Sequence, residues 1–291
     1  MKNILLAILI ALTALSACNT KTKIDNKPIV TVSIAPQKYF IERLMGDSLD
    51  VNIMIPQGSD HASYAPTAAQ IKRLSKSIAY FKMGHLGFEA GWNDKLNAAN
   101  QNMKWFDLSD GIDIIQGEHH HHDHDHDHIC TGGVDPHTWT SPKEVKILTR
   151  NLKKHLLALF PEYKDLVSSN YEIFIGELDE MDERLNKLQT RNPDLTFMIF
   201  HPAYTYLARA YNFEQITIEF EGKTPTPGKL KSTIELAREK QIKTIYIQQE
   251  FDQSNAKVIS EEIGANTVQV NPLSENWMAE MERFISHLEN Q

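Results

Sequence analysis

The spacing of apolar positions alternates along the chain between two patterns. Runs rich in β-branched residues are typical of buried strands, whereas apolar residues three and four positions apart are typical of helices. The first pattern predicts strands at 29–34, 51–55, 78–82, 104–108, 195–200, 215–220, 243–248 and 267–270. The second predicts helices near 36–45, 66–77, 88–99, 162–189, 203–211, 226–240, 254–263 and 277–288. Strands that alternate with helices predict an α/β fold with largely parallel sheets covered by helices.

The longest helical pattern, at 162–189, carries one continuous apolar stripe. Its apolar residues are Tyr171, Phe174, Ile175, Leu178, Met181, Leu185 and Leu188, and its acidic face has Glu172, Glu177, Asp179, Glu180 and Glu183. At about 1.5 Å per residue such a helix runs the height of a domain. We therefore expect two lobes, each a mostly parallel sheet flanked by helices, joined by this one long rigid helix, with a cleft between them.

A further helix is expected to begin at Pro142, a residue type suited to the first turn. Ser141 before it and Glu144 after it have the spacing of a capping box, in which each side chain binds a backbone N–H of the other residue. This helix starts a helical segment at 142–192 that includes the linker helix. It separates an N-terminal lobe at 28–141 from a C-terminal lobe at 193–291.

The first residues are expected to be a targeting segment. Lys2 precedes the apolar run from Ile4 to Leu15, which is too short to span a membrane. The following Leu15-Ser16-Ala17-Cys18 resembles a bacterial lipobox, which would make 1–17 a lipoprotein signal peptide and leave lipid on Cys18. An ordinary cleaved secretory signal is the alternative. The polar residues up to 27 then form a tether, at 18–27.

The composition is that of a globular protein with room for two cores. The 291 residues are 41% hydrophobic and 23% charged, and the formal net charge is −8, which argues against a nucleic acid as partner. There are two cysteines. If Cys18 carries lipid, Cys130 has no disulfide partner in the chain. Cys130 is then either a solitary loop thiol or a soft metal ligand.

Between residues 119 and 128 the sequence reads HHHHDHDHDH. Imidazole and carboxylate are common ligands of borderline divalent metals, and the run is internal, so it is not a terminal tag. It lies in an expected loop at 117–130, which we expect to bind zinc loosely; a solvated linker is the alternative. The accessory ligands would be His119, His120, His121, His122, Asp123, His124, Asp125, His126, Asp127 and His128.

Other side chains that are able to bind a ligand lie where expected strands end or a helix begins. Ligands of open α/β sheets bind outside the carboxyl ends of the strands. Two lobes whose strand ends face one cleft would bring such side chains together. The candidates are His61, His85, His137, His201, Glu250 and Asn271.

Four segments follow one another at these positions. They are Gly58 to Pro66, Asp135 to Pro142, Phe200 to Tyr204 and Val270 to Leu273. In this order they resemble the solute-binding lipoproteins of zinc and manganese ABC importers, and the resemblance covers about 29–288. It implies a monomeric, high-affinity Zn²⁺-binding protein, lipid-anchored on the periplasmic or extracellular face of a bacterial membrane. Such a protein hands the ion to a membrane permease, which works with an ATPase.

Carried over by position, the resemblance implies that His137 and His201 are metal ligands and that His61 is the first ligand. The family usually places its first histidine two residues before a tyrosine, whereas His61 is three residues before Tyr64. His85 is therefore an alternative for this position.

The family's fourth position is usually an aspartate, and here it is Asn271. An amide oxygen is a neutral, weaker ligand, so water, Glu250 or Glu221 is an alternative fourth ligand. Three imidazoles with one weak oxygen suit tetrahedral zinc, whereas manganese prefers more carboxylate oxygens. Zinc is thus the expected cargo, with manganese as the alternative.

Other functions are possible on the same fold. A zinc hydrolase would need an open metal position and a general base, commonly in an H-E-x-x-H helix, and the sequence has no such motif. We therefore expect no enzyme. A metal-binding surface adhesin or a zinc-buffering lipoprotein is the alternative.

Overall fold

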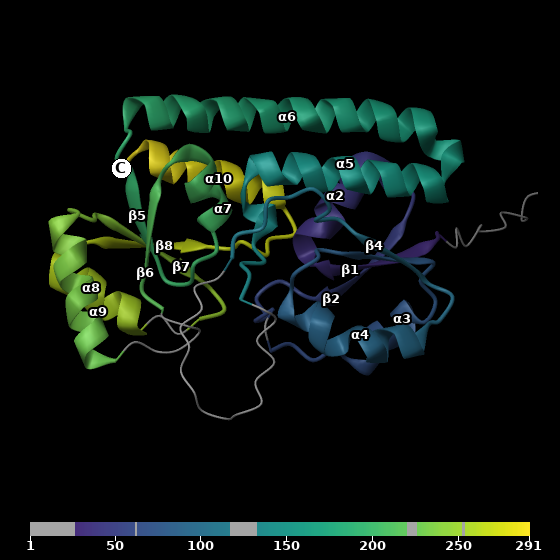
Figure 1. Ribbon diagram of the computed structural model, residues 1–291, viewed down its shortest axis with the longest axis horizontal. Coiled ribbons are helices and arrows are strands. Elements are labelled where there is room, and N and C mark those ends of the chain that lie inside the picture. Colours follow the sequence, from purple (N-terminus) through teal and green to yellow (C-terminus); the bar gives the residue numbers. More distant parts are fainter. Residues whose placement is uncertain (1–26, 62, 117–132, 220–225, 252–253) are drawn as a thin grey trace, which may run out of the picture.

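The computed structural model describes residues 27–61, 63–116, 133–219, 226–251 and 254–291. Two lobes lie side by side, and one long helix, α6 (Lys164–Arg191), runs along both of them (Figure 1). Each lobe contains a four-stranded parallel sheet with helices around it, which confirms the predicted fold class. The expected leader, Cys18, the histidine run, Cys130 and Glu221 lie outside the described residues.

The N-terminal sheet has the strand order β2-β1-β3-β4, with every neighbouring pair parallel. Its strands are β1 (Ile29–Ile34), β2 (Asp50–Ile55), β3 (Ala79–Lys82) and β4 (Lys104–Asp107), and the helices that connect them are α2 (Ala35–Met45), α3 (Ala68–Leu74) and α4 (Gly87–Ala99). Val30, Val32 and Ile34 of β1 are fully buried. Thr31 and Ser33 between them are fully buried as well, because a strand in the middle of a parallel sheet is covered on both faces.

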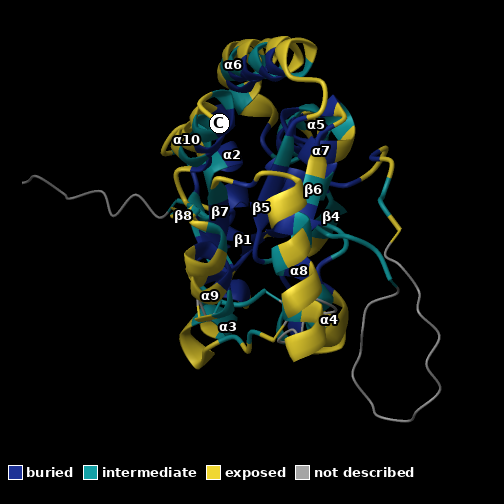
Figure 2. Ribbon diagram, turned by 90° about the vertical axis from the view of Figure 1, so that its left-hand side faces the viewer, coloured by how far each residue is buried: buried dark blue, intermediate teal, exposed yellow. Residues whose placement is uncertain are grey.

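The C-terminal sheet repeats this order as β6-β5-β7-β8, again all parallel. Its strands are β5 (Thr196–Ile199), β6 (Glu214–Thr217), β7 (Thr244–Gln248) and β8 (Asn266–Val270), and its helices are α7 (Thr205–Tyr211), α8 (Pro227–Glu239), α9 (Ser254–Ile263) and α10 (Trp277–Glu289). Much of both sheets is buried, whereas the outer helices expose one face (Figure 2). In both lobes the chain reverses its winding direction beside the first strand, where α/β sheets bind ligands.

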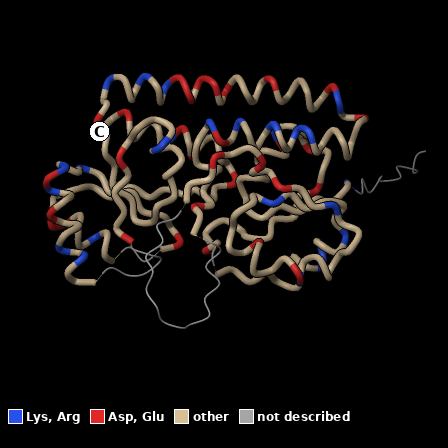
Figure 3. The backbone as a smooth tube through the Cα atoms, viewed as in Figure 1, with Lys and Arg blue, Asp and Glu red and all other residues tan. Residues whose placement is uncertain are grey.

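Helix α6 forms a continuous support for both lobes. It packs on α2 and α5 (Pro142–Leu159) of one lobe and on α7 and α10 of the other. At 1.5 Å per residue it spans about 42 Å. Its buried residues are Val167, Phe174, Leu178, Met181, Leu185 and Leu188. The predicted stripe is therefore present, although Tyr171 and Ile175 are only half-buried, and acidic residues lie along the helix (Figure 3).

Helix α5 begins at Pro142 as predicted, but its capping differs from the sequence expectation. The Ser141 side chain makes no capping hydrogen bond, and its Oγ is buried without a partner among the described residues. Glu144 instead accepts a hydrogen bond from Arg209 of α7 at 3.3 Å. The capping-box prediction is wrong, because this tertiary ion pair draws the Glu144 carboxylate away from the end of its own helix.

Other helix ends also differ from the predicted bounds. Helix α3 begins at Ala68 because Thr67 caps it, its Oγ1 accepting a hydrogen bond from the Gln70 N–H at 3.3 Å. A short 3₁₀ turn at Pro161–Tyr163 precedes α6, which therefore starts later than expected. Within the described part of the chain, no helix combines the length and the apolarity that a membrane crossing requires.

Two buried tryptophans fasten the lobes to each other. The indole N–H of Trp139 donates to the carbonyl of Pro272 at 2.9 Å, and the indole N–H of Trp277 donates to the carbonyl of Trp139 at 2.7 Å. This reciprocal pair joins the segment after β8 to the segment that contains His137. The strand ends of the two lobes are thereby held close together.

Candidate metal centre

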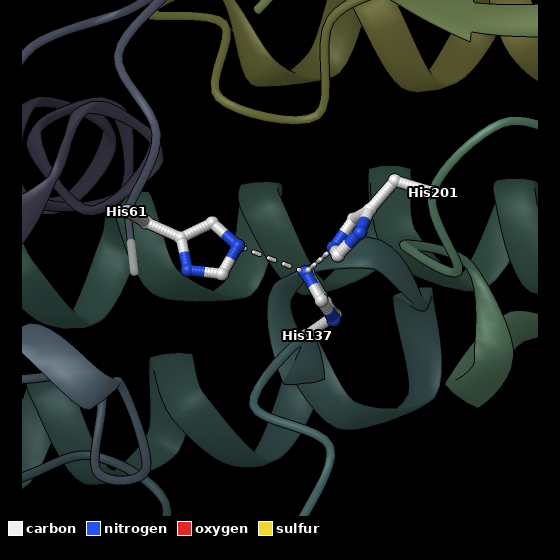
Figure 4. Close-up of side chains that lie close together, drawn as sticks. All are labelled: His61, His137 and His201. Carbon is white, nitrogen blue, oxygen red and sulfur yellow. Dashed lines mark hydrogen bonds between the residues drawn. The ribbon is translucent and has the colours of Figure 1, made fainter. Parts of the chain in front are cut away.

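Three histidines that are remote in the sequence converge between the lobes (Figure 4). His61 follows β2, His201 follows β5, and His137 directly precedes the 3₁₀ turn Thr138–Thr140. The Nε2 atom of His137 lies 3.1 Å from that of His61 and 3.2 Å from that of His201. The ligand atoms of all three residues lie within 4.8 Å of one another, an arrangement that is able to hold a metal ion.

The distances between these nitrogens suit a small divalent cation. A tetrahedral zinc ion with Zn–N bonds of about 2.0–2.1 Å holds its ligand nitrogens roughly 3.3 Å apart. The separations of 3.1 and 3.2 Å in the structure differ from that edge by about 0.2 Å or less. His137 is therefore spaced from each of the other two rings as a zinc ion requires, and three ligands leave one vertex of the tetrahedron for another.

Carboxylates behind the rings orient two of the imidazoles. The Nδ1 atom of His137 lies 2.8 Å from Oδ1 of Asp135, and the Nδ1 atom of His201 lies 2.8 Å from Oε2 of Glu219. A carboxylate accepts a hydrogen bond from Nδ1–H, so the lone pair of each ring is on Nε2, toward the centre of the group.

Asp135 is held in its charged form by the histidine that it orients. Burial raises the pKa of the Asp135 carboxyl, but the nearby His137 imidazole and the hydrogen bond from the His137 backbone N–H outweigh burial, and the net pKa is below the usual value. Sequence reasoning assigned no role to Asp135 or to Glu219. For Asp135 a signal exists, since it stands two residues before His137; nothing in the sequence pattern singles out Glu219.

His61 lies in a different environment. Burial, followed by the proximity of His137 and His201, lowers the pKa of its imidazole well below the usual value, so the ring is neutral at neutral pH. Its Nδ1 atom is buried without a hydrogen-bond partner among the described residues. A neutral imidazole retains a lone pair for a metal ion, which a protonated one lacks.

His201 is held on its backbone and on its ring face as well. The Gln248 side chain accepts a hydrogen bond from the His201 N–H at 3.2 Å and donates one to the His201 carbonyl at 2.7 Å. The Phe251 ring stacks on the imidazole, with a centroid distance of 4.8 Å and an interplanar angle of 25°. The last residue of β7 and the segment after it therefore both contact this histidine.

The remaining candidates from the sequence fall into two groups. His85 is not a member of the histidine group, so His61 is the residue that joins His137 and His201. Glu250 and Asn271 each have one buried side-chain oxygen without a hydrogen-bond partner among the described residues. These two oxygens are available to a further partner.

Comparison with known proteins identifies a family and a similar solved structure. The family described as "Zinc-uptake complex component A periplasmic" (ZnuA) matches residues 30–291. A crystal structure of ZnuA is similar to this chain with a TM-score of 0.82 and 33% identity, over 91% of this chain and 99% of that one.

Two curated relatives differ in the metal that their names give. The zinc-binding lipoprotein AdcA of Streptococcus pneumoniae is 25% identical over 314 residues, which cover 98% of this chain and 60% of AdcA. The manganese ABC transporter substrate-binding lipoprotein PsaA of Streptococcus anginosus is 25% identical over 276 residues, which cover 89% of this chain and 85% of PsaA. The names of the relatives therefore do not decide between zinc and manganese, and the donor atoms of the site are the feature that bears on this choice.

Proposed function

Since the chain belongs to the zinc-uptake complex component A family, and so is a substrate-binding protein of a metal ABC transporter, we propose that its cargo is Zn²⁺. The family consists of substrate-binding transport proteins and not of enzymes, which confirms the expectation that the chain is no hydrolase. The ion is therefore cargo, captured between the lobes and handed to the permease that works with the ATPase.

The convergence of His61, His137 and His201 is the observation that carries this proposal. All three contribute imidazole nitrogens, and no carboxylate belongs to the group in the described part of the chain. Nitrogen donors in a tetrahedral arrangement suit zinc, whereas manganese prefers oxygen donors and a higher coordination number. The donor set thus favours zinc over the manganese alternative.

The packing of the lobes supports release by local movement. Helix α6 packs on both lobes, and the Trp139–Trp277 pair fastens them next to the site. We expect the loops that contain the ligands, such as the one with His61, to move when the permease receives the ion. A wide hinge motion would break the buried contacts of α6.

The proposal includes a membrane anchor and an accessory loop. The relatives AdcA and PsaA are named lipoproteins, which supports lipid attachment at Cys18 and a position outside the cytoplasm. The histidine run at 119–128 would bind zinc weakly and raise its concentration near the cleft.

Zinc affinity of single-histidine variants tests the proposal. Outer partners of metal ligands contribute roughly 10- to 100-fold in affinity, so loss of a ligand itself should cost about 100-fold or more. We expect His201→Ala and His61→Ala to lose this much zinc affinity. Competition with a zinc chelator, at less than one zinc ion per chain, measures it. His85→Ala is the matched control and should bind like the unaltered protein. Full affinity in His201→Ala would contradict the proposal.

A further inference from the structure

Three buried side-chain oxygen atoms of the C-terminal lobe have no hydrogen-bond partner among the described residues. They are Oη of Tyr204, Oε2 of Glu250 and Oδ1 of Asn271, which follow β5, β7 and β8 respectively. Buried polar atoms nearly always have a partner, so each of these oxygens is able to accept a further one. Of these three side chains, Glu250 is the only one that carries a charge near neutral pH.

Glu250 lies in the segment that holds His201. Gln248, two residues before it, makes hydrogen bonds with the backbone N–H and carbonyl of His201, and Phe251, one residue after it, stacks on the imidazole. Burial raises the pKa of the Glu250 carboxyl, and a hydrogen bond from its own backbone N–H, followed by the attraction of His201, partly opposes this. Glu250 is thus flanked in the sequence by two residues that contact His201.

The histidine group needs such a carboxylate. Three neutral imidazoles bring no charge to a buried dication, and they fill three of the four vertices of a zinc tetrahedron. Burial of an ion without compensating charge is costly. A buried carboxylate with one oxygen unpaired is costly as well. One contact between the ion and the Glu250 carboxylate would relieve both costs.

We propose that Glu250 is the fourth ligand, and that its carboxylate rather than the Asn271 amide determines how tightly the site holds divalent cations. The inference rests on the proposed function, in which the three histidines bind the ion. Glu250 lies outside the group of ligand atoms within 4.8 Å, so its side chain rotates toward the ion when the ion arrives. Because manganese depends more on oxygen ligands than zinc does, Glu250 also sets how well manganese competes.

Affinities of the mature protein for Zn²⁺ and for Mn²⁺, measured by chelator competition, test the inference. Glu250→Gln should weaken Zn²⁺ binding about tenfold or more, since even outer partners contribute roughly 10- to 100-fold. It should weaken Mn²⁺ binding by a larger factor. Glu261→Gln removes the same charge from the exposed face of α9 and should leave both affinities unchanged. Asn271→Ala should have the smaller effect on both metals.

Thermal unfolding without metal separates a ligand from a structural residue. Glu250→Gln replaces a buried carboxylate that has one unpaired oxygen by a neutral amide, so its melting temperature without metal should equal or exceed that of the unaltered protein. A lower melting temperature would assign Glu250 a structural role and overturn the inference. So would unchanged Zn²⁺ affinity in Glu250→Gln, or a larger loss in Asn271→Ala. If one of these results is obtained while His201→Ala still loses zinc, only the inference about Glu250 fails. If His201→Ala binds zinc normally, the proposed function itself fails.

Discussion

The Nδ1 atom of His201 lies 2.8 Å from the Oε2 atom of Glu219, and the two side chains are 18% and 6% exposed. Glu219 follows β6, the strand next to the one that His201 follows, so adjacent strand ends supply a ring and the carboxylate that orients it. Asp135 does the same for His137 from within one loop. Both lobes therefore contribute an oriented imidazole to the centre.

Removal of the Glu219 carboxylate should weaken zinc binding without removing a ligand. We expect Glu219→Ala to lower zinc affinity by roughly 10- to 100-fold, because the His201 ring loses the group that fixes its tautomer and rotation. Glu214→Gln is a suitable control, since Glu214 lies at the other end of β6 in a surface ion pair with Lys240. Chelator competition measures both variants, and equal affinities would show that Glu219 does not orient the ring.

The reciprocal tryptophans allow a separate prediction about stability. The indole N–H of Trp277 donates to the buried carbonyl of Trp139 at 2.7 Å. Trp277→Phe retains an aromatic ring but leaves that carbonyl without its donor. An unsatisfied buried acceptor costs about 1–3 kcal/mol, so the free energy of unfolding in urea should fall by at least this amount.

Trp105→Phe is the matched control for this loss. Its indole nitrogen is buried without a partner among the described residues, so the same change in ring size removes no hydrogen bond. The difference between the two variants isolates the contribution of the Trp277 hydrogen bond. Equal losses of stability would mean that this hydrogen bond does not hold the lobes together.

The parts of the structure that the sequence predicted depend on local patterns. The buried strand Ile29–Ile34 and the apolar stripe of α6 follow from side-chain periodicity, because the spacing of apolar residues along the chain shows which face of an element is buried. The positions of His61 and His201 follow from the rule that ligands gather at the carboxyl ends of parallel strands. Periodicity also located the helices, although their ends shifted where a cap such as Thr67 decided the first residue.

The parts that the sequence did not predict depend on contacts between distant segments. No local sequence pattern predicts that the two sheets have the same strand order. Glu219 looks like an ordinary acidic residue until β6 places it beside His201. Similarly, Ser141 and Glu144 have the spacing of a capping box, but Arg209 of α7 competes for the carboxylate. The choice between His61 and His85 also required the three-dimensional arrangement.

A buried carboxyl group in the N-terminal lobe should make stability depend on pH. Glu89 of α4 accepts hydrogen bonds from the Ser33 hydroxyl and from the backbone N–H groups of Met83, at 2.6 Å, and Gly84, at 2.8 Å. Burial, only partly opposed by these hydrogen bonds, raises the pKa of Glu89 from 4.5 to about 7. The folded state therefore binds a proton more tightly than the unfolded state does.

The sign of the effect follows from this raised pKa. The stabilising contribution of the protonated Glu89 is complete below pH 4.5 and is lost as the pH rises to about 7. Relative to Glu89→Gln, which does not titrate, the free energy of unfolding of the unaltered protein should fall by up to about 3 kcal/mol across this range. Urea unfolding at several pH values measures the difference. A difference that stays constant with pH would show that Glu89 does not titrate in this range.

Deletion of residues 119–128 should separate the accessory zinc sites from the cleft. The two chain segments at the base of this loop are paired, through an antiparallel bridge between Gln116 and Val134 and a hydrogen bond from the Asp135 N–H to the Ile115 carbonyl at 2.9 Å. This pairing holds Asp135 and His137 in place independently of the residues beyond it. We therefore expect calorimetry to show one tight zinc site before and after the deletion, and the weak sites only before it. A control in which the ten residues are replaced by serine and glycine keeps the loop length and should behave like the deletion. Loss of the tight site in both variants would mean that the histidine run itself contributes to the cleft, because the paired base is common to both.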